Sequence, residues 1–274
     1  MHPFLRSERA AGQAAVRSAS PLYPGWRFLP VWRRNALVWR KLALPSLIGN
    51  IAEPLLTLAA FGWGVGSLVG TVGGVPYILF LASGTVSMSV MNSASFESLY
   101  SAFSRMHVQK TWDAILLTPT ALDDVLLGEL LWASTKALMS GLALVLVVAI
   151  LGISRHPTLL LVLPVLALVG MLFSALGLIV NALAKSYDFF TYYFTLVLTP
   201  MSFLSGIFFP LSAMPPWLQR LAEVLPLQAA VQLVRPLFLG RWDAHAMLHL
   251  SVLLAYLLGG WFLARQLTHR RYAA

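Results

Sequence analysis

The sequence predicts an all-α integral membrane protein with six transmembrane helices, and two observations carry this prediction. First, 58% of the 274 residues are hydrophobic and only 11% are charged, whereas a soluble domain carries about a quarter charged residues. Second, six apolar segments are each long enough to cross a bilayer as a helix of ~20 residues. The expected spans are residues 42–69, 77–100, 125–153, 159–184, 187–210 and 245–267.

The distribution of positive charge orients the chain. The protein has 19 Lys and Arg residues and a net charge of +9. Most of these residues lie before the first span, after the second or after the last, and such an excess marks the cytoplasmic side of a membrane protein. We therefore expect both termini in the cytoplasm, a flexible cytoplasmic tail over residues 1–25 and a single transmembrane domain over residues 26–274. The same bias accounts for the basic charge without any contact with nucleic acid.

An amphipathic segment precedes the first span. On a helical wheel, Trp32 and Trp39 fall on one arc, whereas Arg33 and Arg40 fall on the opposite arc. A basic helix with Trp on its apolar face lies along a membrane surface, which predicts an N-terminal interfacial helix in contact with lipids. The alternative is a plain basic flank that only sets the orientation of the chain.

One long cytoplasmic segment, residues 101–124, joins the second and third expected spans. It mixes apolar and charged side chains, which predicts a short helix lying across the cytoplasmic face. An exposed helix that combines a large aromatic residue with mixed charges is suited to docking a partner, but a simple amphipathic linker has the same pattern. The candidate docking residues are Arg105, Met106, His107, Gln109 and Trp112.

Several ionisable residues fall inside the expected spans. Glu53 lies ~16 Å into the first span at 1.5 Å per residue, on the same helix face as Asn50, and Lys136 has the same estimated depth in the third span. Because an unpaired charge in hydrocarbon is costly, we expect Glu53 and Lys136 to approach each other, or each to face a polar interface. Such residues serve either as a structural contact between spans or as part of a substrate path. Glu97 and Glu129, near the cytoplasmic ends of their spans, are expected to reach the lipid headgroups.

Aromatic residues crowd the start of the fifth expected span, at Tyr187, Phe190, Tyr193 and Phe194. This grouping is typical of an interfacial aromatic belt. It also suits an aromatic girdle along a path for sugars, which stack on aromatic faces, or for acyl chains. The sequence leaves both interpretations open.

The segment between the fifth and sixth expected spans, residues 211–240, is broken by prolines but stays apolar. Proline removes a backbone donor and obstructs the preceding helical turn, so we expect an outer hairpin of two short helices, partly sunk in the membrane. Non-helical backbone at that depth must be covered by protein or face a water-filled cavity, which indicates an exit or a gate. Its candidate functional residues are Pro215, Trp217 and Arg235.

The sequence contains no motif for nucleotide binding, metal binding or nucleophilic catalysis. It has no G-x-x-x-x-G-K-[ST] phosphate loop, no H-E-x-x-H or comparable metal cluster and no serine nucleophile elbow. We therefore expect no catalytic residue, no metal site and no cofactor in this chain.

Three stretches carry a resemblance to a known family: TWDAILLTPTALDDVLLGELLWASTKA, FLSGIFFPLSAMPPWLQ and LPLQAAVQLVRP. From about Trp26 to Arg271 the chain is similar to the membrane (permease) subunits of type-2 ATP-binding-cassette exporters. More narrowly, it resembles the nodulation protein J group, which exports lipo-chitooligosaccharides. The chain departs from the family's pattern after Leu-Pro-Leu, where Gln228, Ala229 and Gln232 replace Ser/Thr, His and an acidic residue. This departure weakens the case for a polar role of the outer hairpin.

The resemblance implies a partner subunit. Two copies of this chain would form the transmembrane part in the bacterial inner membrane, joined by two copies of a separate ATPase subunit that binds ATP and Mg. The segment from Arg105 to Trp112 would be the coupling helix seated in the ATPase, and the helix from Trp32 to Lys41 would also touch the ATPase. The outer hairpin would cap the exit.

The function expected from these observations is export of an amphipathic substrate, namely a lipo-oligosaccharide, a polysaccharide, a lipid or a drug. Two alternatives belong to other classes. An ion-gradient-driven secondary transporter often shows two related halves, which are not seen here. An intramembrane enzyme that modifies lipids or sugars needs an acid/base set, for which Glu53, Glu129 and Lys136 are available.

Overall fold

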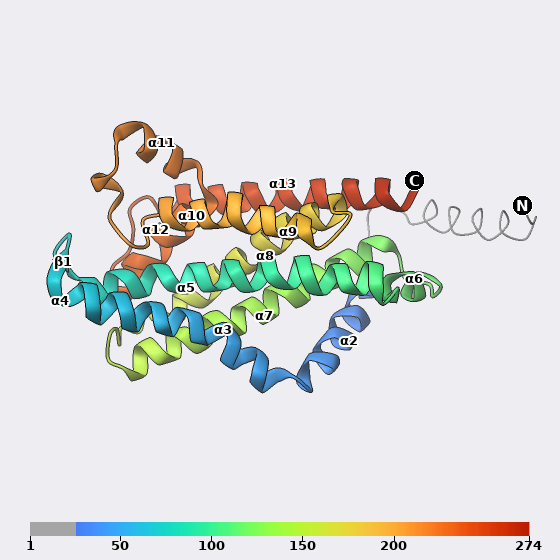
Figure 1. Ribbon diagram of the computed structural model, residues 1–274, viewed down its shortest axis with the longest axis horizontal. Helices are drawn as coiled ribbons and strands as arrows, with labels where there is room; N and C mark the ends of the chain where they lie inside the picture. Colours follow the sequence, from blue (N-terminus) through green and yellow to red (C-terminus); the bar gives the residue numbers. More distant parts are fainter. Residues whose placement is uncertain (1–25, 274) are drawn as a thin grey trace, which may run out of the picture.

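The computed structural model describes residues 26–273, which form a helical protein with one short two-stranded hairpin (Figure 1). Segments η1 to η4 have the wider hydrogen bonding of a π-helix, and η5 is a 3₁₀ turn. The elements in chain order are α2 (Phe28–Arg40), α3 (Ala43–Thr57), η1 (Leu58–Val65), α4 (Gly66–Val69), β1 (Thr71–Val72), β2 (Val75–Pro76), α5 (Tyr77–Phe96), η2 (Glu97–Ser101), η3 (Ser104–Val108), α6 (Thr111–Leu116), α7 (Leu122–Ile150), α8 (Leu159–Leu183), α9 (Asp188–Tyr193), η4 (Phe194–Leu198), α10 (Thr199–Leu204), η5 (Leu211–Ala213), α11 (Pro216–Val224), α12 (Pro226–Phe238) and α13 (Ala246–Ala273).

Five helices in the described part are long and apolar enough to cross a membrane, and they cover Ala43–Val69, Tyr77–Val108, Leu122–Ile150, Leu159–Leu183 and Ala246–Ala273. The pair α11 and α12 passes the same test when taken together, although the two helices are bent by 87° relative to each other. The chain is therefore a multi-span helical membrane protein with five to six candidate spans.

Three of the expected spans end several residues away from the predicted ends; the sixth is the simplest case, since α13 runs to Ala273 rather than to residue 267. The second continues to Val108, because the segment beyond residue 100 that suggested a loop packs into the bundle through the buried residues Phe103, Arg105 and Met106. The helix is interrupted at Lys110, which adopts a left-handed conformation with a φ of 54°, and the separate short helix α6 follows. In the fifth, continuous helix covers only residues 188–204, ~26 Å at 1.5 Å per residue. The chain leaves that helix just before Gly206, whose φ of 69° favours glycine.

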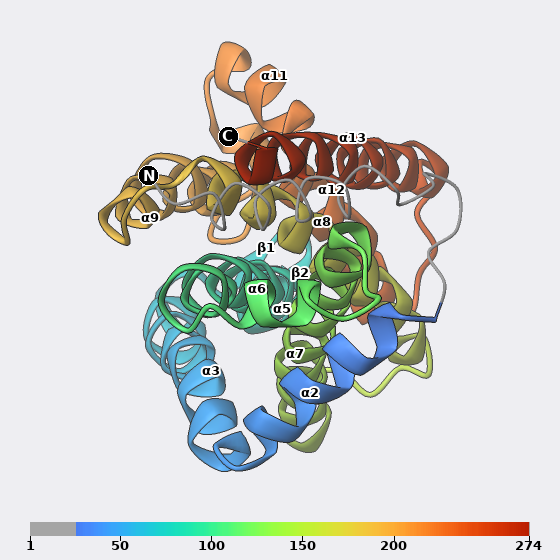
Figure 2. The ribbon, with the colours of Figure 1, turned by 90° about the vertical axis from the view of Figure 1, so that its right-hand side faces the viewer.

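The helix from Tyr77 to Val108 forms the centre of the bundle. In its most apolar stretch 83% of the residues are buried. The corresponding stretches of Ala43–Val69 and of Ala246–Ala273 have only 11% of their residues buried. The elements α7, α8 and α12 pack against α5 (Figures 1 and 2). Small residues permit this close approach: a Cβ added at Gly141 of α7 would lie 2.6 Å from Cγ2 of Val90 on α5.

The two ends of the bundle carry different elements. The elements α2 and α6 and the C-terminal end of α13 lie at one end, which we call the α6 end (Figure 1). The β1–β2 hairpin and α11 lie at the opposite end, which we call the α11 end. The helix α3 runs from the α6 end toward the α11 end, and α5 runs back in the opposite direction (Figure 1).

The tryptophan face of α2 contacts protein. The rings of Trp32 and Trp39 meet the ring of Trp132 on α7 edge-on, with centroids 6.4 and 5.8 Å away, while Arg33 and Arg40 are exposed. The amphipathic pattern thus predicts the helix and its two faces. Its apolar face packs on α7, however, so it is not free to lie in lipid alone.

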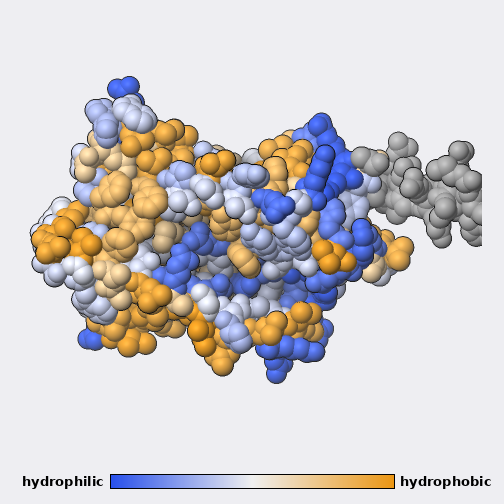
Figure 3. Space-filling view, in the orientation of Figure 1, coloured by the Kyte–Doolittle hydropathy of each residue, from blue (hydrophilic) through white to orange (hydrophobic). Residues whose placement is uncertain are grey.

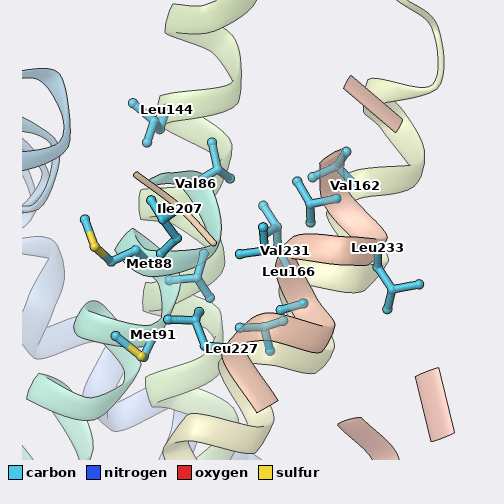
Figure 4. Packing of buried hydrophobic residues seen from close by; sticks show 14 of the residues in the cluster. Val86, Met88, Met91, Leu144, Val162, Leu166, Ile207, Leu227, Val231 and Leu233 are labelled. Carbon is cyan, nitrogen blue, oxygen red and sulfur yellow. The ribbon is translucent and has the colours of Figure 1, made fainter. Parts of the chain in front are cut away.

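The hairpin of two short helices expected after the fifth span is present, but α12 belongs to the core. Leu227 and Val231 of α12 lie in one apolar cluster with Val86 of α5, Leu166 of α8 and Ile207 (Figure 4). The first helix, α11, stays at the surface, where Pro215 at its start and Trp217 are exposed.

Arg235 fastens α12 to its surroundings. Its Nε donates to Ser83 Oγ at 3.1 Å, and its Nη2 donates to the carbonyl oxygen of Gly206 at 2.6 Å. The guanidinium also lies 3.8 Å from the centre of the Phe80 ring, a cation–π contact. Arg235 therefore joins three parts of the chain at the α11 end and has a structural role there.

Gly128→Ala is expected to lower the thermal stability of the purified protein. The added Cβ would lie 2.6 Å from the Cβ of Val31 and 2.9 Å from the carbonyl oxygen of Phe28, so α2 must move away from α7 at a cost of about 1–3 kcal/mol. Thermal melting in detergent measures the change. Gly259→Ala in α13 is the matched control, since nothing lies within 4 Å of its added Cβ. Equal melting temperatures for the two variants would contradict this packing.

Candidate functional site

A cavity of about 930 Å³ opens between the first span, α5 and the η4–α10 segment. Figure 3 shows the hollowed face, where hydrophilic residues gather between hydrophobic bands. Its aromatic lining consists of Phe61, Tyr77, Phe96, Phe194, Phe203, Phe208 and Phe209. Its polar lining consists of Asn50, Glu53, Thr57, Ser89, Asn92, Ser93, Thr199 and Ser202. We call this space the main cavity.

Helix distortions shape both walls of the main cavity. Pro54 lacks a backbone donor, and the first span passes into the π-helical segment η1 a few residues later. On the opposite wall, η4 precedes Pro200. Such π-helical turns are rare and often occur at functional sites. They turn side chains of otherwise regular spans toward the space between the walls.

Glu53 lines the main cavity and has no ion-pair partner among residues 26–273. Lys136 instead places its Nζ 2.8 Å from Oε2 of Glu97. The expected approach of Glu53 and Lys136 is therefore wrong, and the other expectation, a polar interface for each, describes the structure. Equal depth in two spans does not predict an ion pair, because the contact also depends on which neighbouring helix each residue faces.

Four buried charges form a cluster near the α6 end. Arg105 places Nη1 3.0 Å from Oε1 of Glu97 and donates from Nε to Oε1 of Glu129 at 2.9 Å. Lys136 completes the set through Glu97. The side chains of Arg105, Lys136, Glu97 and Glu129 are 11%, 11%, 4% and 2% exposed. We call these residues the four-charge cluster, and their formal charges sum to zero.

Two tryptophans complete the hydrogen bonding of the four-charge cluster. The indole N–H of Trp112 donates to Oε1 of Glu129 at 3.0 Å, and that of Trp132 donates to Oε1 of Glu97 at 2.8 Å. Each carboxylate thus accepts from both a cation and an indole. This is the arrangement that makes a buried ion pair tolerable.

The expected headgroup contact of Glu97 and Glu129 is wrong, because both carboxylates point into the bundle. The sequence does contain a signal for this. Glu129 and Lys136 are seven residues apart, so they share one face of α7, and Arg105 follows Glu97 after eight residues on a helix that continues past residue 100. These spacings, taken together, predict a cluster that no single charge indicates.

The candidate docking residues divide into two groups. Arg105, Met106 and Trp112 are buried, so the expected exposed surface does not include them. His107 is partly exposed and Gln109 is exposed at the α6 end. The first group holds the end of the helix and α6 in place, and the second group remains accessible to a partner.

A second cavity of about 480 Å³ separates α2 from the four-charge cluster. Its lining includes Asn35 and Trp39 of α2, and Glu97, Arg105 and Lys136 of the cluster. The inner face of α2 therefore looks onto the cluster across a polar space. A displacement of α2 would change the surroundings of these charges.

The candidate path aromatics occupy different environments. Phe190 is fully buried and packs against Phe103, with ring centroids 5.1 Å apart. Tyr187 lines the second cavity, Phe194 lines the main cavity, and Tyr193 is largely packed inside the bundle. Of this set, Phe194 alone meets the main cavity. Four further aromatic residues of the lining were not predicted from the sequence: Phe61, Phe203, Phe208 and Phe209. They lie on segments whose only signal in the sequence is their apolar length.

Within the described part of the chain, no three His, Asp or Glu side chains are grouped so as to hold a metal ion. The polar groups of the main cavity are amides, hydroxyls and one carboxylate. Groups of this kind offer hydrogen-bond donors and acceptors to a bound molecule.

Comparisons with known proteins agree with this architecture. Residues 28–239 match the model of the ABC-2 type transporter family. The chain is 45% identical to nodulation protein J of Sinorhizobium fredii over 258 residues, which are 94% of this chain and 97% of the relative. It is 46% identical to nodulation protein J of Rhizobium meliloti over 247 residues, 90% and 94% of the two chains. The inner membrane transport permease YadH of Escherichia coli is 24% identical over 240 residues, 88% and 93% of the two chains. The chain belongs to the ABC-2 type transporter family and is a membrane permease of that family.

Proposed function

We propose that this permease is the transmembrane subunit of an ATP-driven exporter for an amphipathic substrate: a lipo-oligosaccharide, a polysaccharide, a lipid or a drug. The substrate would leave from the cytoplasm or the inner leaflet. The observation that carries the proposal is the main cavity, about 930 Å³ in volume, in a chain of the ABC-2 type transporter family. Its lining combines aromatic, aliphatic and polar side chains. Such a lining accommodates a molecule with an apolar part and a polar part.

The proposed complex contains two copies of this chain and two copies of a separate ATP-binding subunit, which holds ATP and Mg, in the bacterial inner membrane. The α6 end faces the cytoplasm with both termini, and the α11 end faces outward. The exposed residues Arg33 and Arg40 at the α6 end support this orientation, because positive charge is enriched on the cytoplasmic side. In the most apolar stretch of the helix Ala43–Val69, only 11% of the residues are buried. The surface of this helix is therefore available to lipid and to the second copy.

The contact with the ATP-binding subunit is proposed at the tip of the α6 end. His107 and Gln109 lie there, beside Val108 and Leu117, which are 65% and 90% exposed. Two exposed apolar side chains at the end of a bundle, outside the expected membrane core, suit a protein partner. We call Val108, Gln109 and Leu117 the coupling surface.

The four-charge cluster lies directly behind the coupling surface and is proposed to transmit its movement. It ties the end of the helix through Arg105, and α6 through Trp112, to Glu129 on α7. ATP can drive transport only if the partner binds it with different affinity in two states of the transporter. A rigid link between the coupling surface and α7 lets that difference bias the position of the spans.

Leu117→Asp is expected to weaken association with the ATP-binding subunit by at least about tenfold, since a charge replaces an apolar contact at the centre of the coupling surface. Co-purification of the two tagged subunits and a binding titration measure the effect. Trp217→Asp, which changes an exposed apolar residue at the α11 end, is the matched control and should leave association intact. Equal loss in both variants would contradict the location of the contact.

Arg105→Lys and Trp112→Phe are expected to uncouple ATP hydrolysis from transport, because each removes a donor to Glu129 while the charges of the cluster stay balanced. ATPase activity of the assembled complex should persist while transport per ATP falls by about tenfold or more. Paired assays of hydrolysis and transport in the same proteoliposomes provide the ratio. Normal coupling in both variants would leave the cluster with a structural role only.

Lys136→Met is expected to destabilise the protein by about 3–5 kcal/mol, because removing one partner leaves a buried charge uncompensated. Adding Glu97→Gln removes both members of the pair and should recover part of the loss. Thermal melting of wild type, both single variants and the double variant completes the cycle. Additive losses in the double variant would show that the two groups are not coupled.

Reconstitution tests the proposed function as a whole. Proteoliposomes that contain the permease and its ATP-binding subunit should move a fluorescent NBD-labelled glycolipid across the bilayer only with ATP and Mg. A hydrolysis-deficient partner subunit is the control. Transport that persists without any ATP-binding subunit would indicate a gradient-driven transporter, and chemical conversion of the glycolipid by the purified chain would indicate an enzyme.

A further inference from the structure

We infer that Glu53 makes the main cavity selective for charge, so that it accepts neutral or cationic headgroups and excludes anionic ones, with the headgroup toward the α6 end. This inference rests on the proposed function, because it describes what the same cavity binds. It adds the chemistry and the orientation of the bound molecule.

The lining of the main cavity contains a single acidic or basic side chain. Glu53 is the only Asp, Glu, Lys, Arg or His among the lining residues of the described chain. No basic group of residues 26–273 lies within ion-pair distance of its carboxylate. The other intramembrane carboxylates behave differently, since Glu97 and Glu129 are neutralised by Arg105 and Lys136. The charge of Glu53 therefore acts on whatever occupies the cavity.

The lining also changes character along the bundle. At the part nearer the α6 end, α3 contributes Asn50 and Glu53, and α5 contributes Asn92 and Ser93. The side-chain nitrogen of Asn50 is buried and has no hydrogen-bond partner within the described chain. Amides, a hydroxyl and a carboxylate together offer donors and acceptors to hydroxyl, amide or ammonium groups. An unsatisfied buried donor is costly, which a bound headgroup would relieve.

Toward the α11 end the lining becomes aromatic. Phe208 lies 5.7 Å from Phe61 and 5.4 Å from Phe203, measured between ring centroids. All three line the cavity, together with Val65, Val69 and Phe209. Aromatic and aliphatic walls of this kind suit an acyl chain or another apolar tail. Phe96 also lines the part nearer the α6 end, but the polar groups gather there and the aromatic cluster lies toward the α11 end, which favours one direction for an amphipathic molecule.

A carboxylate acts strongly in such a place. Glu53 is exposed to the cavity, and at the effective dielectric near a protein surface two like charges a few ångströms apart still repel by several times what they would in bulk water. A phosphate or sulfate headgroup beside Glu53 would meet this repulsion, whereas an ammonium group would be attracted and a sugar hydroxyl would donate to the carboxylate. Specificity of this kind arises from a repulsive element as much as from new contacts.

Three NBD-labelled probes with one dodecyl tail and different headgroups test the inference: a maltoside, a trimethylammonium and a phosphate. Binding to the purified full-length chain in nanodiscs is followed by fluorescence. Wild type should bind the ammonium and the maltoside at least about tenfold more tightly than the phosphate. Glu53→Gln should remove the preference of ammonium over phosphate, and Glu53→Asp should keep it. Glu223→Gln, at an exposed position of α11 outside the cavity, is the control and should behave as wild type.

A cavity-filling variant separates the inference from the proposed function. Thr57→Trp should weaken the binding of all three probes, since Thr57 lines the cavity and the larger side chain would fill part of it. If Thr57→Trp abolishes binding and Glu53→Gln leaves the preference unchanged, the charge selectivity is overturned and the cavity remains the binding site. If Thr57→Trp has no effect on any probe, the probes bind elsewhere, and both the selectivity and the role of the cavity in transport are overturned. Glu53 has no partner within the described chain, so its variants are expected to fold, which melting temperatures check.

Discussion

Neutralisation of buried charge is the constraint on which the α6 end of this permease depends. Moving a carboxylate or a guanidinium out of water costs several kcal/mol, and the cost is offset only when geometry and hydrogen bonding are complete. In the four-charge cluster both carboxylates receive a cation and an indole donor. These contacts leave little freedom for α7 to slide along the central helix. Trp112 ties α6 to the same cluster through Glu129. The cluster therefore holds in place the coupling surface that we assign to the partner.

The main cavity depends on a different device, the departure of helices from regular geometry. Pro54 and Pro200 each remove a backbone donor from a span, and π-helical segments lie beside both of them. A regular helix presents one face to its neighbours, whereas a π-helical turn shifts the register of the residues that follow. The walls that contain Glu53 and Phe194 are therefore held apart, while α7 and α8, which carry no such segment, pack closely against α5.

The sequence predicted the helical membrane fold, the family and most spans, because apolar length and the side of the positive charges are local properties. It also predicted the hairpin, since Pro215 precedes α11 and Pro226 begins α12, and the start of a helix is where proline is best accommodated. It could not assign partners to charges. Glu97, Arg105, Glu129 and Lys136 come from two helices whose relative rotation is set by packing, and Lys136 meets Glu97 rather than Glu53 for that reason. The burial of Arg105 and Trp112 was missed because the helix was expected to end at residue 100, whereas it runs to Val108.

The four-charge cluster and the main cavity share one helix, and this connects their roles. Phe96 lines the cavity, and Glu97, the next residue, pairs with Arg105 and Lys136. The central helix is packed tightly beside these residues, where a Cβ added at Gly177 of α8 would lie 2.7 Å from the Cβ of Ser98, so it cannot bend continuously there. A displacement of the cluster must therefore move Phe96 and the polar residues one turn before it, or be absorbed by the π-helical turns that begin at Glu97. Movement at the α6 end therefore reaches the headgroup side of the cavity, where Glu53 lies, before its aromatic side.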